Sequence, residues 1–202
     1  MTKYIFDLIS FLPLSKKEPK QVVILCHGYG GDGRDISVLA NNWRRFLPEA
    51  VFLCPNAPEI CEINQHGYQW FGLDQKDEEV VLEKSLVAEK KLNSFLDQVL
   101  HNFQLETNKL ALVGFSQGCM MVIQTALKKK EKINCLLGYS GKIINKNHLS
   151  NKIISKPKIF LMHGDKDAVV FPGHLLEAKD FLAQNGLKIK TKLFKNCEHK
   201  IS

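Results

Sequence analysis

Residues 109–121 read KLALVGFSQGCMM and contain the pattern that decides the fold. The apolar run at 110–113 predicts a strand, the pentapeptide GFSQG at 114–118 predicts a sharp turn, and the apolar residues after it predict a helix. Larger side chains in place of the two glycines would collide with the neighbouring strand and helix. The serine at the tip lies beside the free N–H groups of a helix N-terminus. Ser116 is therefore the candidate nucleophile, provided that the rest of the chain supplies its partners.

Apolar runs alternate with amphipathic segments along the rest of the chain. Continuous apolar runs such as QVVILC at 21–26 are typical of strands buried on both faces, whereas the apolar spacing over 80–103 predicts a helix. The alternation predicts an α/β fold, a mostly parallel sheet with helices on both faces, and the lack of repeats or linkers predicts one domain over residues 1–202. The expected strands are 4–14 (one or two edge strands), 21–26, 50–53, 110–113, 133–137, 158–162 and 187–194, the expected helices are 36–46, 80–103, the segment after the serine to about 130, and 174–185, and residues 59–79 are expected to be irregular.

Composition limits the classes of partner. With 202 residues, 45% of them hydrophobic and 24% charged, the chain is typical of globular proteins with a substantial core. The net charge of +7 comes from lysines spread along the chain, and the densest cluster, at 128–132, ends a predicted helix, where cations suit the helix dipole. We therefore expect no nucleic-acid partner. No apolar run is long enough to span a bilayer, and Asp7 interrupts the apolar residues near the N-terminus, so neither a transmembrane segment nor a signal peptide is expected.

The six cysteines predict buried thiols. Four lie in or beside apolar runs, where free cysteine behaves as a small hydrophobe, and none forms a C-x-x-C pair. Neither a disulfide framework nor a zinc site is expected, and the default location is the reducing cytoplasm.

A serine hydroxyl needs a base to take its proton and a third group to orient that base. After an elbow of this kind the acid and then the histidine follow along the chain, on loops at the carboxyl ends of strands. His199 directly follows the last predicted strand, whereas His174 comes too soon after Asp167 to reach the serine from a separate loop. Asp167 is favoured over Asp165 as the acid, because Asp165 adjoins a glycine and suits a turn. The other histidines are expected to shape turns (His27, His163) or to lie at the surface (His66, His101, His148).

The oxyanion of such a reaction needs two fixed N–H donors. One is expected from Gln117, directly after the nucleophile, and the other from the backbone of Tyr29 in the glycine-rich loop at 27–33. The alternative for this loop, a phosphate cradle, lacks both the G-x-x-x-x-G-K-[ST] and the G-x-G-x-x-G patterns.

Seven segments together resemble the phospholipase/carboxylesterase family. LCHGYGGDG, CPNAP, QWFGLD, LVGFSQGCMM, GYSGKI, HGDKDAVV and CEH occur in the family's order, between residues 21 and 199. The resemblance implies an α/β-hydrolase fold without cofactor or metal, with Ser116, Asp167 and His199 as the triad and Tyr29 and Gln117 as oxyanion donors. It also implies a carboxylesterase or acyl-protein thioesterase activity.

The resemblance has two departures. Gly72 stands where the family's WF(D) element has Asp, and only three residues follow His199, whereas family members continue into a helix that covers the sheet. Without that C-terminal helix we expect an uncovered apolar strip beside the last strand, which favours a homodimer or lower stability. The candidates for the acyl pocket, each of which could equally belong to the core, are Tyr68, Trp70, Phe71, Phe115, Val169 and Phe171.

The function expected from the sequence is a cofactor-free serine hydrolase that cleaves carboxylic esters or thioesters through an acyl-enzyme. Its expected substrate is a small-molecule ester, a lysophospholipid or an acylated protein. The alternatives are a peptidase or dienelactone-type hydrolase on the same fold, or a catalytically inactive α/β-hydrolase that acts as a binding module.

Overall fold

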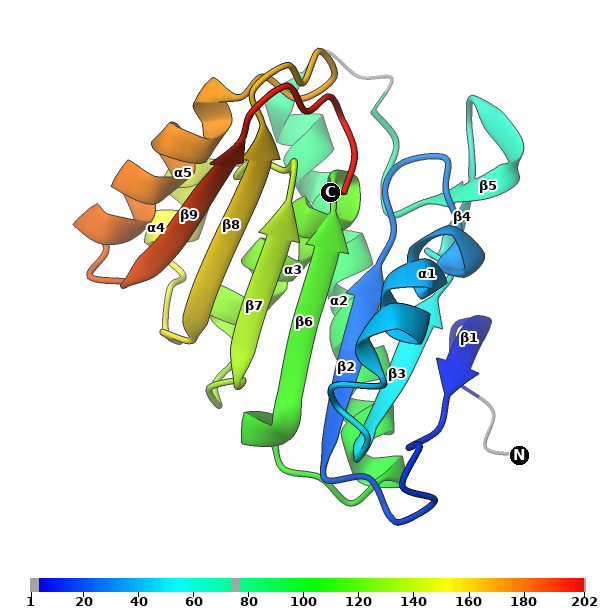
Figure 1. Cartoon of the computed structure of the whole chain (residues 1–202). Helices are drawn as coiled ribbons and strands as arrows, with labels where there is room; N and C mark the ends of the chain where they lie inside the picture. The colour runs from blue at the N-terminus through cyan, green and yellow to red at the C-terminus, as the bar shows by residue number, and fades with distance from the viewer. Residues whose placement is uncertain (1–3, 74–76, 202) are drawn as a thin grey trace.

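The computed structural model describes residues 4–73 and 77–201 (Figure 1). Its centre is a seven-stranded sheet, accompanied by a separate two-stranded hairpin. In chain order the elements are β1 (Leu8–Phe11), β2 (Gln21–Cys26), α1 (Gly33–Trp43), β3 (Ala50–Pro55), β4 (Glu59–Cys61), β5 (Asn64–Gln69), α2 (Glu78–Asn102), the 3₁₀ turn η1 (Thr107–Lys109), β6 (Leu110–Phe115), α3 (Gln117–Lys128), β7 (Cys135–Tyr139), α4 (Lys146–Ser150), β8 (Lys158–Gly164), α5 (Gly173–Gln184) and β9 (Ile189–Phe194).

The sheet is parallel except at one edge. The strand order is β1-β3-β2-β6-β7-β8-β9, and only β1 pairs in the antiparallel sense. The predicted mostly parallel sheet is therefore confirmed. Because the parallel strands share a direction, the loops after β2, β6 and β8 all lie at the carboxyl end of the strands. The site described below lies at that end.

Two elements differ from the expectation. Residues 59–79 were expected to be irregular, but they contain the β4–β5 hairpin and the start of α2. The hairpin strand NQHGYQ is mostly polar and has no apolar alternation, so its strand character comes from pairing with β4 and with the loop after β2. The five-residue helix α4 was also not predicted, because it buries only Leu149 and so has no periodic apolar face.

The two faces of the sheet are covered differently. Helices α2, α3, α4 and α5 lie behind the sheet in Figure 1 and α1 lies in front of it. Helix α3 is buried from Gln117 to Leu127, because it lies between the sheet and α2. None of the described helices has the length and the apolar composition needed to cross a membrane.

The front face is only partly covered. Helix α1 packs over β1, β2 and β3, and Figure 1 shows no other described helix on this face. Over β6, β7 and β8 the side chains of Ala111, Leu137 and Phe160 are only half-buried. In the described part of the chain these partly exposed apolar side chains lie on β6, β7 and β8, the last of which is beside β9, and the uncovered apolar strip stays a prediction.

Candidate active site

The turn between β6 and α3 has the geometry that the sequence predicted. Ser116 has φ +53° and ψ −117°, a backbone conformation that side-chain-bearing residues rarely adopt. A Cβ on Gly114 would overlap the carbonyl oxygen of Gly118, and a Cβ on Gly118 would overlap that of Cys26. The N–H of Ser116 donates to the carbonyl of Tyr139 over 2.8 Å, which fixes the turn to β7. These contacts present the serine hydroxyl at the edge of the sheet.

His199 approaches this serine from the segment that follows the edge strand β9. The segment after β9 runs back across the top of the sheet toward the end of β6 (Figure 1). It brings His199 Nε2 to 3.0 Å from Ser116 Oγ, while His199 Nδ1 lies 2.8 Å from Asp167 Oδ2. The ring also packs on Phe115, with 4.8 Å between ring centroids. Ser116 and Asp167 are 7% and 4% exposed, so both are largely shielded from solvent.

Asp167 is held by several N–H groups. Its Oδ1 accepts hydrogen bonds from the N–H of Val169 at 3.0 Å and of Val170 at 2.8 Å. Burial alone would raise the pKa of Asp167, but the hydrogen bonds from His199, Val170 and Val169 outweigh it and hold that pKa below its usual value. The carboxylate is therefore ionised and can only accept, so Nδ1 of His199 carries the hydrogen. Nε2 is left free to accept the serine proton.

The two expected oxyanion donors, Tyr29 and Gln117, both come from backbone near Ser116 that lines the same cavity. Within the described part of the chain, the backbone N–H groups of Tyr29 and Gln117 donate to no acceptor, and both residues line the cavity at Ser116. The loop that carries Tyr29 is fixed by the hairpin: Gly30 N–H donates to Tyr68 O at 2.9 Å and Tyr68 N–H donates to Gly31 O at 2.8 Å. The free N–H groups thus belong to backbone that is already anchored.

His27 fixes the start of the same loop. Its Nε2 accepts from the N–H of Ala57 at 3.0 Å, so its Nδ1 carries the hydrogen and donates to Gly28 O at 2.7 Å. Burial lowers the pKa of His27, which favours this neutral ring. The histidine shapes the turn, as the sequence had suggested.

The segment Trp70–Phe71 links Gln117 to the start of the loop that carries Tyr29. The side-chain amide of Gln117 accepts from Trp70 N–H at 2.9 Å and donates to Phe71 O at 2.6 Å. The indole N–H of Trp70 donates to His27 O at 3.0 Å. One short segment therefore holds both the residue after the nucleophile and the start of the Tyr29 loop.

A cavity of about 750 Å³ opens at Ser116. Four of the six residues expected in the acyl pocket line it, namely Phe71, Phe115, Val169 and Phe171. The valine and Phe171 are 72% and 70% exposed and form its rim. Trp70 is fully buried behind the cavity, and Tyr68 contributes its backbone to the loop instead.

Other cavity-lining residues were not predicted. Met120 could have been found, because it lies one helical turn after Ser116 and so points along the same side of α3. Several others come from segments whose approach depends on the tertiary fold: Ile63, Leu73, Lys142 and Ile144 lie in loops, Glu78 and Val81 lie at the start of α2, and His174 lies at the start of α5.

The rejected candidates have other partners. His174 Nδ1 lies 3.3 Å from Glu177 Oε2, at the start of α5. Asp165 accepts the N–H of Cys197 at 3.3 Å and so anchors the segment that leads to His199. Neither of these two ionisable groups takes part in the contacts of Ser116.

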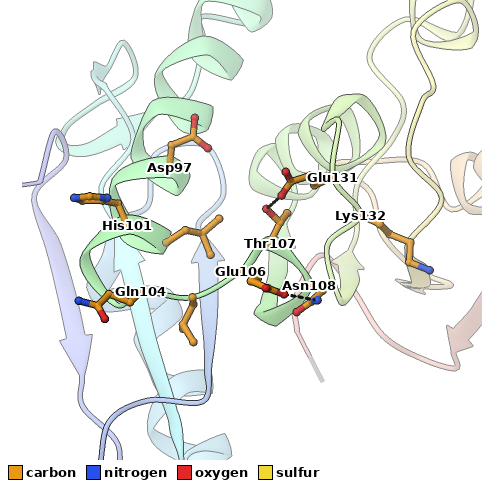
Figure 2. Close-up of a pocket in the computed structure, with 10 residues that line it drawn as sticks. Asp97, His101, Gln104, Glu106, Thr107, Asn108, Glu131 and Lys132 are labelled. Carbon is orange, nitrogen blue, oxygen red and sulfur yellow. Dashed lines mark hydrogen bonds between the residues drawn. The ribbon is translucent and has the colours of Figure 1, made fainter.

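A second cavity, of about 860 Å³, lies at the other end of the strands, where β6 begins (Figure 2). It is formed by the end of α2, η1 and the residues after α3. Two pairs of its polar groups are hydrogen-bonded: Thr107 Oγ1 donates to Glu131 at 2.8 Å and Asn108 Nδ2 donates to Glu106 at 3.0 Å. No serine or cysteine is found among the described residues that line it, so the candidate nucleophile belongs to the first cavity.

The family model, the curated relatives and the solved structures that resemble this chain all point to the same family. The family model described as Phospholipase/Carboxylesterase matches residues 10–202. The chain belongs to this family. The esterase PE8 has a structure that superposes with a TM-score of 0.91 at 33% identity, covering 100% of this chain and 93% of PE8. Acyl-protein thioesterase 1 of Saccharomyces cerevisiae is 30% identical over 196 residues, which cover 89% of this chain and 86% of the yeast protein. Esterase YpfH of Escherichia coli is 22% identical over 92% of this chain and 78% of its own length.

Membership of the family confirms the expected α/β-hydrolase fold. It also makes this chain a carboxylesterase-type serine hydrolase of the group that includes acyl-protein thioesterases. The residue roles and the substrate are matters for proposal.

Proposed function

We propose that this family member hydrolyses carboxylic esters or thioesters through an acyl-enzyme on Ser116. His199 Nε2 takes the serine proton while Oγ attacks the substrate carbonyl carbon. The C–O or C–S bond of the tetrahedral intermediate then breaks, and the imidazolium returns the proton to the leaving alcohol or thiol. Water, deprotonated by the same histidine, attacks the acyl-enzyme and releases the carboxylic acid and the serine.

The observation that carries the proposal is the chain of contacts from Asp167 through His199 to Ser116. The two hydrogen bonds, of 2.8 and 3.0 Å, end on a serine whose backbone is held at φ +53°. Asp167 fixes the imidazole with Nε2 toward the hydroxyl and stabilises the positive charge that forms on the ring.

The backbone N–H groups of Tyr29 and Gln117 are the proposed oxyanion donors. Both belong to anchored backbone, so little reorganisation is needed when charge develops. A single donor of this kind is worth roughly 3 kcal/mol of transition-state stabilisation.

The cavity at Ser116 favours an apolar acyl group. Its wall contains Phe71, Met120 and Phe115, and its rim contains Val169 and Phe171. An acyl chain that binds in this cavity would place its carbonyl carbon next to Ser116 Oγ. The yeast and other fungal relatives named acyl-protein thioesterase 1 make thioesters as well as oxygen esters candidate substrates. We propose small-molecule esters, lysophospholipids or acylated proteins as the substrate class.

The cytoplasm is the proposed location. All six cysteines are free thiols, as is typical of proteins in a reducing compartment. Burial raises the pKa of Cys54 and of Cys119 to about 12, so these thiols are protonated and unreactive in the folded protein.

Turnover of acyl esters tests the proposal. Purified protein is assayed with p-nitrophenyl esters from acetate to laurate and with the matching acyl thioesters. Ser116→Ala should lose activity by about 10³-fold or more, since the nucleophile is gone while the oxyanion donors remain. The matched control is Ser94→Ala, because Ser94 lies exposed on α2 and bonds only to Lys90 O. Folded wild-type protein without turnover of either substrate type would contradict the proposal and favour a binding module.

A further inference from the structure

His163 lies beside the triad carboxylate but plays no part in the mechanism above. It is 2% exposed near the end of β8, four residues before Asp167. Its Nε2 is 2.8 Å from the carbonyl oxygen of Val170 and 3.2 Å from Asp167 Oδ2. A carbonyl oxygen can only accept, so Nε2 carries a hydrogen and donates it to Val170.

That hydrogen bond closes the turn that holds the acid. The carbonyl of Val170 accepts from His163, and the N–H of Val170 donates to Asp167 Oδ1 at 2.8 Å. The N–H of Val169 binds the same carboxylate oxygen at 3.0 Å. His163 therefore fixes the residue that fixes Asp167, and its N–H also approaches the oxygen that accepts from His199.

We infer that His163 is a positioning residue for the triad: it holds Asp167, through Val170, in the orientation that aligns His199 with Ser116. This inference rests on the proposed function of the triad. It assigns His163 no contact with substrate.

The position of the N–H also has an electrostatic consequence. A donor beside the carboxylate favours the ionised acid, so its loss should let Asp167 take up a proton at higher pH. A purely structural histidine would alter stability or the amount of active protein without moving the midpoint of that carboxyl.

Several charged and titratable groups lie near His163 and Asp167. His199 is the charged group that acts on Asp167 directly. Asp165, Lys166 and Glu198 are exposed, where solvent and salt screen their effect. The other titratable groups on the surrounding elements are Tyr139 at the end of β7, His174 at the start of α5 and Cys197 after β9.

The test compares three replacements at this position. His163→Phe keeps an aromatic ring and removes the donor, and His163→Asn carries an amide too short to reach Val170. His163→Gln places an amide N–H at a reach comparable to Nε2. We expect Phe and Asn to lower kcat about tenfold with KM within about threefold of wild type. Gln should restore kcat.

His148→Phe is the matched control. His148 is a half-buried histidine of α4 whose Nε2 has no hydrogen-bond partner in the described residues. This change should leave kcat within about threefold of wild type. The inference is overturned if the folded Phe and Asn variants keep the wild-type kcat, or if Gln behaves as they do.

A measurement without turnover separates this inference from the proposed function. The carboxyl of Asp167 is titrated by ¹³C NMR in wild type and in each variant. Its midpoint should rise in the Phe and Asn variants and return in Gln, whether or not any ester is hydrolysed. An unchanged midpoint in folded variants would overturn the role of His163, even in an active enzyme.

Discussion

Asp165 and Asp167 lie two residues apart in one turn, yet their carboxylates have different partners. Asp167 accepts from His199 and from two backbone N–H groups, whereas Asp165 accepts the N–H of Cys197. The sequence favoured Asp167 because Asp165 adjoins a glycine and suits a turn. The pattern could not exclude Asp165, since which side chain meets His199 depends on how the segment after β9 returns across the sheet.

Replacing the two acids separately tests this assignment. Asp167→Asn should lower kcat by about 10³- to 10⁴-fold, because the amide no longer stabilises the imidazolium or selects its tautomer. Asp165→Asn keeps an oxygen that can accept from Cys197 N–H, so its kcat should stay within about threefold of wild type. Steady-state kinetics on one ester measures both, with circular dichroism to check folding. Equal losses in the two variants would contradict the assignment of Asp167.

Among the secondary-structure elements, sequence patterns did not predict the β4–β5 hairpin or the short helix α4. The main strands and helices could be predicted because each carries an apolar run or an apolar helical face. The hairpin strand β5 is largely polar, and backbone bonds from Tyr68 to Gly30 and Gly31 hold it in place. Such long-range pairing leaves little trace in the local sequence. For the same reason Trp70 was expected in the acyl pocket, whereas its indole is buried against His27.

Trp70→Phe tests whether this segment positions the oxyanion donors. The change keeps a buried ring and removes the N–H that donates to His27 O, which leaves a buried carbonyl unpaired at a cost of about 1–3 kcal/mol. We expect kcat to fall about tenfold with a smaller change in KM, since the loop that carries Tyr29 loses an anchor. Trp43→Phe, in a half-buried position of α1, is the control and should keep wild-type kinetics. Unaltered kcat in Trp70→Phe would argue against the positioning role.

At the scale of the whole molecule, the half-covered front face is the feature with the clearest consequence. Ala111, Leu137 and Phe160 lie there without a described helix over them. The exposed Lys190 and Lys192 border them on β9. An apolar strip of this kind favours self-association, and we propose that this chain forms a homodimer.

Phe160→Lys should weaken that association. A lysine beside Lys190 and Lys192 would place like charges in any interface formed by this face. Sedimentation velocity over a range of protein concentrations should show a smaller sedimentation coefficient for the variant than for wild type. Phe46→Lys is the control, because Phe46 is 72% exposed at the end of α1, away from the strip. A wild-type protein that stays monomeric at every concentration would contradict the proposed homodimer.

The central claim is that Ser116 is an activated nucleophile, and intact-mass spectrometry after treatment with a fluorophosphonate tests it most directly. Attack by Ser116 Oγ on phosphorus expels fluoride and leaves one stable phosphonyl group. We expect a single adduct on wild type, none on Ser116→Ala and a single adduct on the Ser94→Ala control. Folded wild-type protein that gains no adduct, or a Ser116→Ala variant that gains one as fast as wild type, would contradict the account.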